Sequence, residues 1–166
     1  MSSFDIKNNI YKLPKEIYVK CFLSQKDKKQ CRLNIKRWNK ILKKEFFKEE
    51  DRLFVFLKKE YQIIITDIEG AYCDKQYGLV GYSRVYKNKN KRIVGGTIFI
   101  CKKNINFHNR TNADYIEWSK VLLHELGHFI FIDHIAKSGI MKEHYYSNMN
   151  FNKFDKEKFP LIFKKK

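Results

Sequence analysis

Residues 121–134 read VLLHELGHFIFIDH and contain the pattern His124-Glu125-x-x-His128 within an apolar stretch that is typical of a helix. Two histidines four positions apart leave the same face of a helix and can bind one metal ion. Glu125 is displaced around the helix, so it is better placed to act on a water molecule as a general base. Zinc suits imidazole ligands and lowers the pKa of bound water toward about 7. The pattern therefore predicts a helix that carries a zinc site and a base.

A third metal ligand is expected shortly after this pattern. His134 lies ten positions after His124, and three of the five histidines fall within eleven residues. If the helix ends near residue 131, the chain can turn and bring His134 to the same ion. Three protein ligands and an open fourth position are typical of catalytic zinc. Glu143, fifteen positions after His128, is an alternative third ligand.

The whole pattern, with Phe131 between His128 and His134 and with Met141 on a turn after Gly139, resembles the metzincin zinc endopeptidases, and the matrixin-like members most of all. The resemblance implies that His124, His128 and His134 bind Zn²⁺ and that Glu125 is the general base. It implies that Met141 is the Met-turn residue and that the substrate is a protein or peptide. It also implies a zincin-like α+β domain. Such a domain has a twisted, mostly parallel sheet, an edge strand over the cleft, an early helix, an active-site helix and a short C-terminal helix.

Two positions depart from the family pattern. The family usually has glycine at the helix exit where this chain has Phe131, and a left-handed phenylalanine would cost about 1–2 kcal/mol. Either the strain is tolerated, or the helix ends by another geometry, or His134 is not a ligand. After Met141 the chain continues with Lys142 rather than the family's tyrosine, so details of the substrate pocket do not carry over.

Two tyrosines follow the predicted Met-turn. Tyr145 or Tyr146 could contact a tetrahedral oxyanion, as a tyrosine does in some metzincins, or could be a packed aromatic residue.

The patterns along the whole chain predict a single α+β or α/β domain over residues 1–166, with a folded core at 17–159. Branched and aromatic residues favour strands, which we predict at residues 17–23, 53–57, 62–66 and 92–101. Helical spacing of apolar residues predicts an early helix whose stripe runs from Cys31 to Phe46, a long helix from about Thr111, and a last helix at 152–159. Segments 67–83 and 102–110 are predicted to be loops.

The strand at 92–101 is predicted to lie at the edge of the sheet and to pair with substrate through Gly95, Gly96, Thr97 and Ile98. The Gly95-Gly96 pair indicates a bulge or the close approach of another backbone.

The charge is strongly positive, with 35 basic against 18 acidic residues and a formal net charge of +17. Such a field can attract nucleic acid, anionic membranes or acidic polymers. Lysine supplies 29 of the 35 cations, so a genome biased toward A and T also explains the composition. We therefore expect no nucleic-acid partner, although a basic polyanion-binding module with a structural or absent metal is the alternative function.

The N-terminus has no apolar signal region, and no apolar run is long enough to span a membrane. We therefore expect a cytoplasmic protein unless it is exported by another route. The four cysteines form no C-x-x-C pair and are expected to be small buried hydrophobic residues in a reducing compartment. The sequence gives no oligomeric state.

Overall fold

The computed structural model describes residues 6–68, 73, 78–134, 139–142 and 149–164. The fold is α+β, with one five-stranded sheet in the order β2-β1-β3-β5-β4. Four strands are parallel, and β4 alone runs antiparallel to its neighbour β5. The strands are β1 (Ile17–Phe22), β2 (Phe47–Glu49), β3 (Gln62–Thr66), β4 (Gly81–Lys87) and β5 (Ile93–Ile100).

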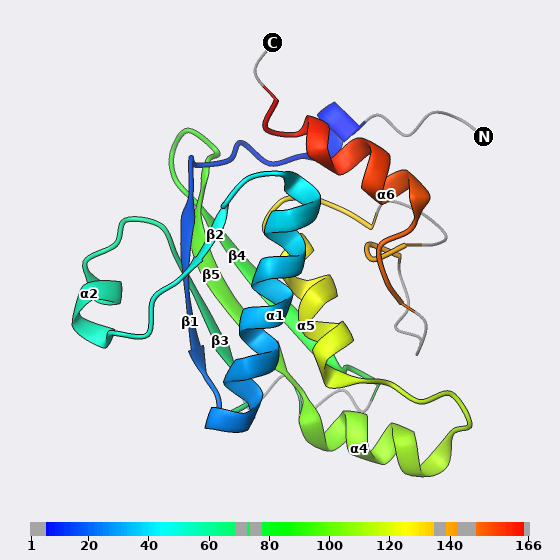
Figure 1. The fold of residues 1–166 in the computed structure, drawn as a ribbon. Helices are drawn as coiled ribbons and strands as arrows, with labels where there is room; N and C mark the ends of the chain where they lie inside the picture. Colours follow the sequence, from blue (N-terminus) through cyan, green and yellow to red (C-terminus); the bar gives the residue numbers. More distant parts are fainter. Residues whose placement is uncertain (1–5, 69–72, 74–77, 135–138, 143–148, 165–166) are drawn as a thin grey trace.

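Helices α1 (Gln25–Leu42) and α5 (Trp118–Gly127) cover one face of this sheet, and α2 (Leu53–Leu57) lies on the other side (Figure 1). The helices are α1 (Gln25–Leu42), α2 (Leu53–Leu57), α4 (Lys102–Thr111), α5 (Trp118–Gly127) and α6 (Lys153–Lys158), and the 3₁₀ turns are η1 (Ile6–Asn9) and η2 (Phe159–Leu161). Helices α1 and α5 lie side by side (Figure 1). None of the described helices is both long enough and apolar enough to cross a lipid bilayer.

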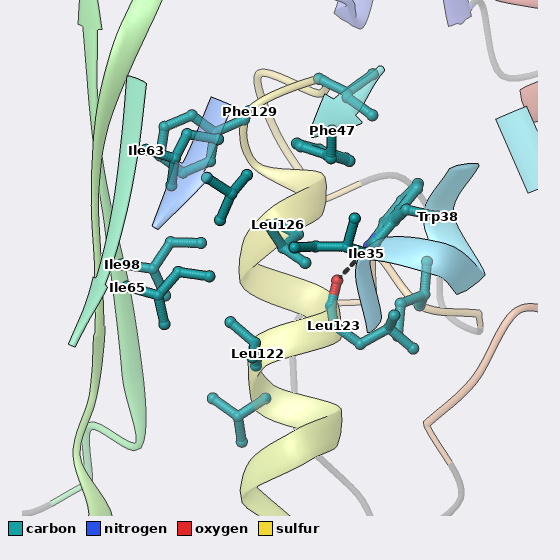
Figure 2. Close-up of a cluster of buried hydrophobic side chains, with 14 of the residues drawn as sticks. Ile35, Trp38, Phe47, Ile63, Ile65, Ile98, Leu122, Leu123, Leu126 and Phe129 are labelled. Carbon is teal, nitrogen blue, oxygen red and sulfur yellow. Dashed lines mark hydrogen bonds between the residues drawn. The ribbon is translucent and has the colours of Figure 1, made fainter. Parts of the chain in front are cut away.

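The core forms between the sheet and α5, where Ile63, Ile65 and Ile98 face Leu122 and Leu126 (Figure 2). All five side chains are fully buried. Period-two alternation explains this arrangement, because every second residue of a strand points toward the same face.

The predicted apolar stripe of the early helix is confirmed for Cys31, Ile35, Trp38 and Leu42, which are buried. Trp38 joins α1 to α5, because its indole Nε1–H donates to the carbonyl of Leu123 at 2.7 Å (Figure 2). A buried indole needs such a partner.

Several predicted elements are wrong. Residues 53–57 form α2 rather than a strand, since a short apolar run does not by itself distinguish the two. Residues 102–110 belong to α4 rather than a loop. The helix that carries His124 begins at Trp118, and Thr111 is the last residue of α4 rather than the start of the later helix. The predicted loop at 67–83 includes the start of β4.

The predicted edge strand is also wrong, because β5 is an interior strand. Gly95, Gly96, Thr97 and Ile98 pair with β3 on one side and with β4 on the other. Their main-chain groups are therefore used within the sheet and cannot receive a substrate strand. The strand at this edge of the sheet is β4.

The close backbone approach predicted at Gly95-Gly96 is confirmed. A Cβ on Gly95 would lie 1.8 Å from the carbonyl oxygen of Gln62, and one on Gly96 would lie 1.8 Å from that of Arg84. Both glycines also have positive φ, at 143° and 158°. Only glycine fits between the two neighbouring strands here.

The cysteines are buried as expected, but they are not free thiols. Cys21 pairs with Cys31, and Cys73 pairs with Cys101. The first disulfide joins β1 to α1, and the second joins Cys73 to the residue before α4. Sequence spacing could not reveal these pairs because their members are ten and twenty-eight positions apart and meet only in the fold.

Candidate metal centre

His124 lies in the last turn of α5 and is almost fully buried. Its Nδ1 lies 2.6 Å from the carbonyl oxygen of Ile140. A carbonyl only accepts hydrogen bonds, so Nδ1 carries the proton and Nε2 is the unprotonated nitrogen of the ring. Burial lowers the pKa of His124 to about 4, so its imidazole is neutral near pH 7. The side chain is thus held in one orientation and in the neutral form that metal binding requires.

The three predicted histidines converge. Nε2 of His128 lies 3.1 Å from Nε2 of His124, one helical turn away. One nitrogen from each of His124, His128 and His134 lies within 4.8 Å of the others, and the ring centroids are 4.8, 5.0 and 5.2 Å apart. Zn–N bonds of about 2.0–2.1 Å at tetrahedral angles separate ligand nitrogens by roughly 3.3 Å. The His124–His128 pair is close to this spacing, and the three histidines together could hold one metal ion.

The three ligands differ in exposure. His124 is 1% exposed and His128 is half-buried, whereas His134 is exposed. Burial also lowers the pKa of His128. Of the three histidines, His134 is the most accessible to solvent.

Phe131 does not need the strained backbone that glycine would relieve. The described non-glycine residues with positive φ are Lys43 and Lys91 alone. After α5 the chain continues through successive turns, with backbone bonds from Phe129, Ile130 and Phe131 to Leu126 and Gly127. The helix thus ends by another geometry, one of the alternatives that the sequence left open.

The Phe131 side chain instead anchors the segment that leads to His134. It is fully buried, with its ring 4.8 Å from that of Phe159. Its backbone forms an antiparallel bridge with Ile10. The N-terminal segment therefore helps to hold the turn between the second and third histidines.

Glu125 is buried between α5 and the edge strand. It is 2% exposed, and the Ser83 hydroxyl of β4 lies within hydrogen-bonding distance of its carboxylate and of its main-chain oxygen. Gly81 makes the close approach of β4 to α5 possible. A Cβ there would lie 2.5 Å from Val121 Cγ1 and 3.3 Å from Glu125 Oε1. The Glu125 carboxylate, α5 and β4 therefore meet at one place.

Met141 packs against α5 at Gly127. It is 1% exposed, and a Cβ on Gly127 would come within 2.2 Å of its sulfur and 2.9 Å of the Trp38 ring. Gly127 is the second of the two positions written x in the pattern His124-Glu125-x-x-His128. Its missing side chain allows the sulfur to pack closely against the helix turn between His124 and His128.

The turn that carries Met141 is tied to α6 by Asp155. Oδ2 of this buried carboxyl accepts from the backbone N–H of Ile140 and from that of Asn152, both at 3.1 Å. Asn152 completes a capping box by accepting from the Asp155 N–H at 2.9 Å. Gly139, at φ 92°, lets the turn approach this cap. One chain of hydrogen bonds thus runs from α6 through Ile140 to His124.

Sequence reasoning did not find Ser83, Gly81 or Asp155. Asp155 had a signal, because Asn152-x-x-Asp155 at the start of a helix is a capping-box pattern. Ser83 and Gly81 had none, since they reach Glu125 only where β4 packs against α5. Tyr145, Tyr146 and the alternative ligand Glu143 lie outside the described residues.

No protein-family model matches the chain, and no curated protein is significantly similar to it in sequence.

Proposed function

We propose that the chain is a zinc-dependent endopeptidase of the metzincin type, in which His124, His128 and His134 hold the metal. The observation that carries the proposal is the convergence of three histidine nitrogens within 4.8 Å beside the buried Glu125. Imidazole ligands favour zinc over the harder cations. When bound, zinc would supply a Lewis acid for the scissile carbonyl and an acidified water.

Glu125 is the group that moves protons in this proposal. Its carboxylate takes a proton from the attacking water and passes it to the leaving nitrogen of the peptide. Ser83 fixes one carboxylate oxygen, which limits the rotation of the side chain. The contact with β4 also places the base next to the strand where a peptide would lie.

A peptide substrate would pair with the outer edge of β4. Within the described residues, no strand pairs with that side of β4. An extended peptide can add there as an antiparallel strand and gain main-chain hydrogen bonds. This replaces β5 as the proposed substrate strand. Two disulfides favour an oxidising setting for this activity over the cytoplasm.

The direct test is the Glu125→Gln variant, assayed for hydrolysis of casein and for bound zinc. Loss of the general base should lower the rate by about 100-fold or more while zinc content stays unchanged. Glu117→Gln is the matched control, because Glu117 is an exposed residue at the start of the same helix. Full hydrolysis by Glu125→Gln would disprove the proposed role of the base.

A further inference from the structure

The turn between β4 and β5 displays a group of lysines on a rigid frame. Asn88 builds this frame, because its Oδ1 accepts from the backbone N–H of Asn90 at 2.9 Å and from that of Arg92 at 3.0 Å. Two further backbone bonds close the turn, from Asn88 to Arg92 and from Lys91 to Asn88. Lys87, Lys89 and Lys91 all project from it and are exposed. We call these three residues the lysine turn.

The positive charge of the lysine turn is not neutralised locally. Within the described residues, no ion pair involves any of the three lysines. The sequence contains no Asp or Glu between residues 75 and 113, a stretch that includes both strands of the hairpin. Lys12 adds another exposed cation nearby, since its carbonyl accepts from the N–H of Ile93.

The lysine turn lies at the far end of the same edge strand that reaches the metal centre. Strand β4 starts at Gly81, beside Glu125, and ends at Lys87. At about 3.3 Å per residue, Lys87 is roughly 13 Å along the strand from Ser83. A peptide that runs antiparallel to β4 would have its N-terminal side at the lysine turn. The lysine turn would therefore lie beside peptide residues about four to six positions before the cleaved bond, which would lie next to Glu125.

We infer that the lysine turn selects peptide substrates with acidic side chains about four to six residues N-terminal to the cleaved bond. This inference rests on the proposed function. A polypeptide fits better than a nucleic acid, because no strand of the described residues pairs with the outer edge of β4 and only a peptide chain can extend the sheet there by main-chain hydrogen bonds. The cations are also lysines, which act as point charges and do not provide the bidentate contacts that arginine makes with phosphates.

The inference is tested by exposing the zinc-loaded protein to a peptide library made from a digested proteome and sequencing the products by mass spectrometry. The wild type should show Asp and Glu enriched at those N-terminal positions. Replacing Lys87, Lys89 and Lys91 together by serine should reduce the cleavage of such peptides by about tenfold, since each exposed ion pair contributes about twofold to fivefold. Cleavage of peptides without acidic residues there should fall by much less, so the ratio of the two rates should change by about tenfold.

A matched control removes the same charge elsewhere. Lys29, Lys36 and Lys40 are exposed on α1, so their triple serine variant has the same net charge but an intact lysine turn. The control should keep the acidic preference. If both triple variants lose it equally, the preference comes from total charge and the inference is wrong. Cleavage by the wild type without any acidic preference would also overturn it.

A binding assay separates failure of the inference from failure of the proposed function. A fluorescein-labelled peptide with glutamates in its N-terminal half is titrated with the zinc-loaded Glu125→Gln variant, beside a twin with the glutamates in its C-terminal half. The first peptide should bind more tightly than its twin, and this difference should disappear when the three lysines are also replaced by serine. That result supports the inference even if the wild type hydrolyses nothing. Equal binding of the twins, or stronger binding of a single-stranded oligonucleotide, contradicts it.

Discussion

Replacing Asp155 by alanine is expected to destabilise the protein and to weaken its metal site, although Asp155 contacts no predicted ligand. Its carboxyl oxygen accepts two backbone N–H bonds, from Ile140 and Asn152. Ile140 in turn accepts the Nδ1–H of His124. The variant therefore removes the outermost link of the chain of hydrogen bonds that orients the first ligand.

The size of the effect follows from the two lost acceptors. A buried donor left without a partner costs about 1–3 kcal/mol. Part of that is offset, because burial raises the pKa of Asp155 and ionising the buried carboxyl is unfavourable in the wild type. We expect a net loss of about 2–4 kcal/mol in the free energy of unfolding. Zinc affinity should fall by about 10- to 100-fold, as for other groups that orient a histidine ligand.

Urea denaturation of the metal-free protein measures the first effect, and competition with a chromophoric chelator measures the second. Asp155→Asn is the control, because its amide oxygen can still accept from Ile140 and should keep most of both properties. An Asp155→Ala variant within about 0.5 kcal/mol of wild type, with unchanged zinc affinity, would show that α6 does not support the site.

Two further predictions concern the base and the first ligand. Gly81→Ala should force β4 away from Val121 and Glu125, which should lower the free energy of unfolding by about 1–3 kcal/mol. The variant should keep its zinc but hydrolyse casein about tenfold more slowly. Unchanged activity would contradict the close fit of β4 against α5. The pKa of His124 falls from 6.5 in the unfolded chain to about 4 in the fold, so the unfolded chain binds the extra proton between these pH values. The metal-free protein should therefore lose about 3 kcal/mol of stability as the pH falls through that range, and a flat profile in urea denaturation would contradict the burial of His124.

The sequence predicted the parts of the fold that depend on local periodicity. The early helix has its stripe at Cys31, Ile35 and Trp38, and the α+β class with a mostly parallel sheet is as expected. Errors arose where short segments have ambiguous patterns. The run at 53–57 is apolar on every side and becomes helix α2, with Phe56 alone of its residues buried.

The convergence of the histidines could be predicted because His124 and His128 share a helix face whatever surrounds them. The support for these ligands could not, because it depends on contacts between distant segments. Asp155 reaches Ile140 from α6, and Ser83 reaches Glu125 from β4. The edge position of β4 follows only from the pairing order of all five strands.

Zinc stoichiometry of the purified protein and of its His134→Ala variant tests the central claim most directly. The three-histidine site predicts one zinc per wild-type chain, measured by plasma mass spectrometry after dialysis. The variant should bind zinc at least about 100-fold more weakly, because two imidazoles remain. A wild type without zinc, or a variant with unchanged zinc affinity, would contradict the three-histidine site.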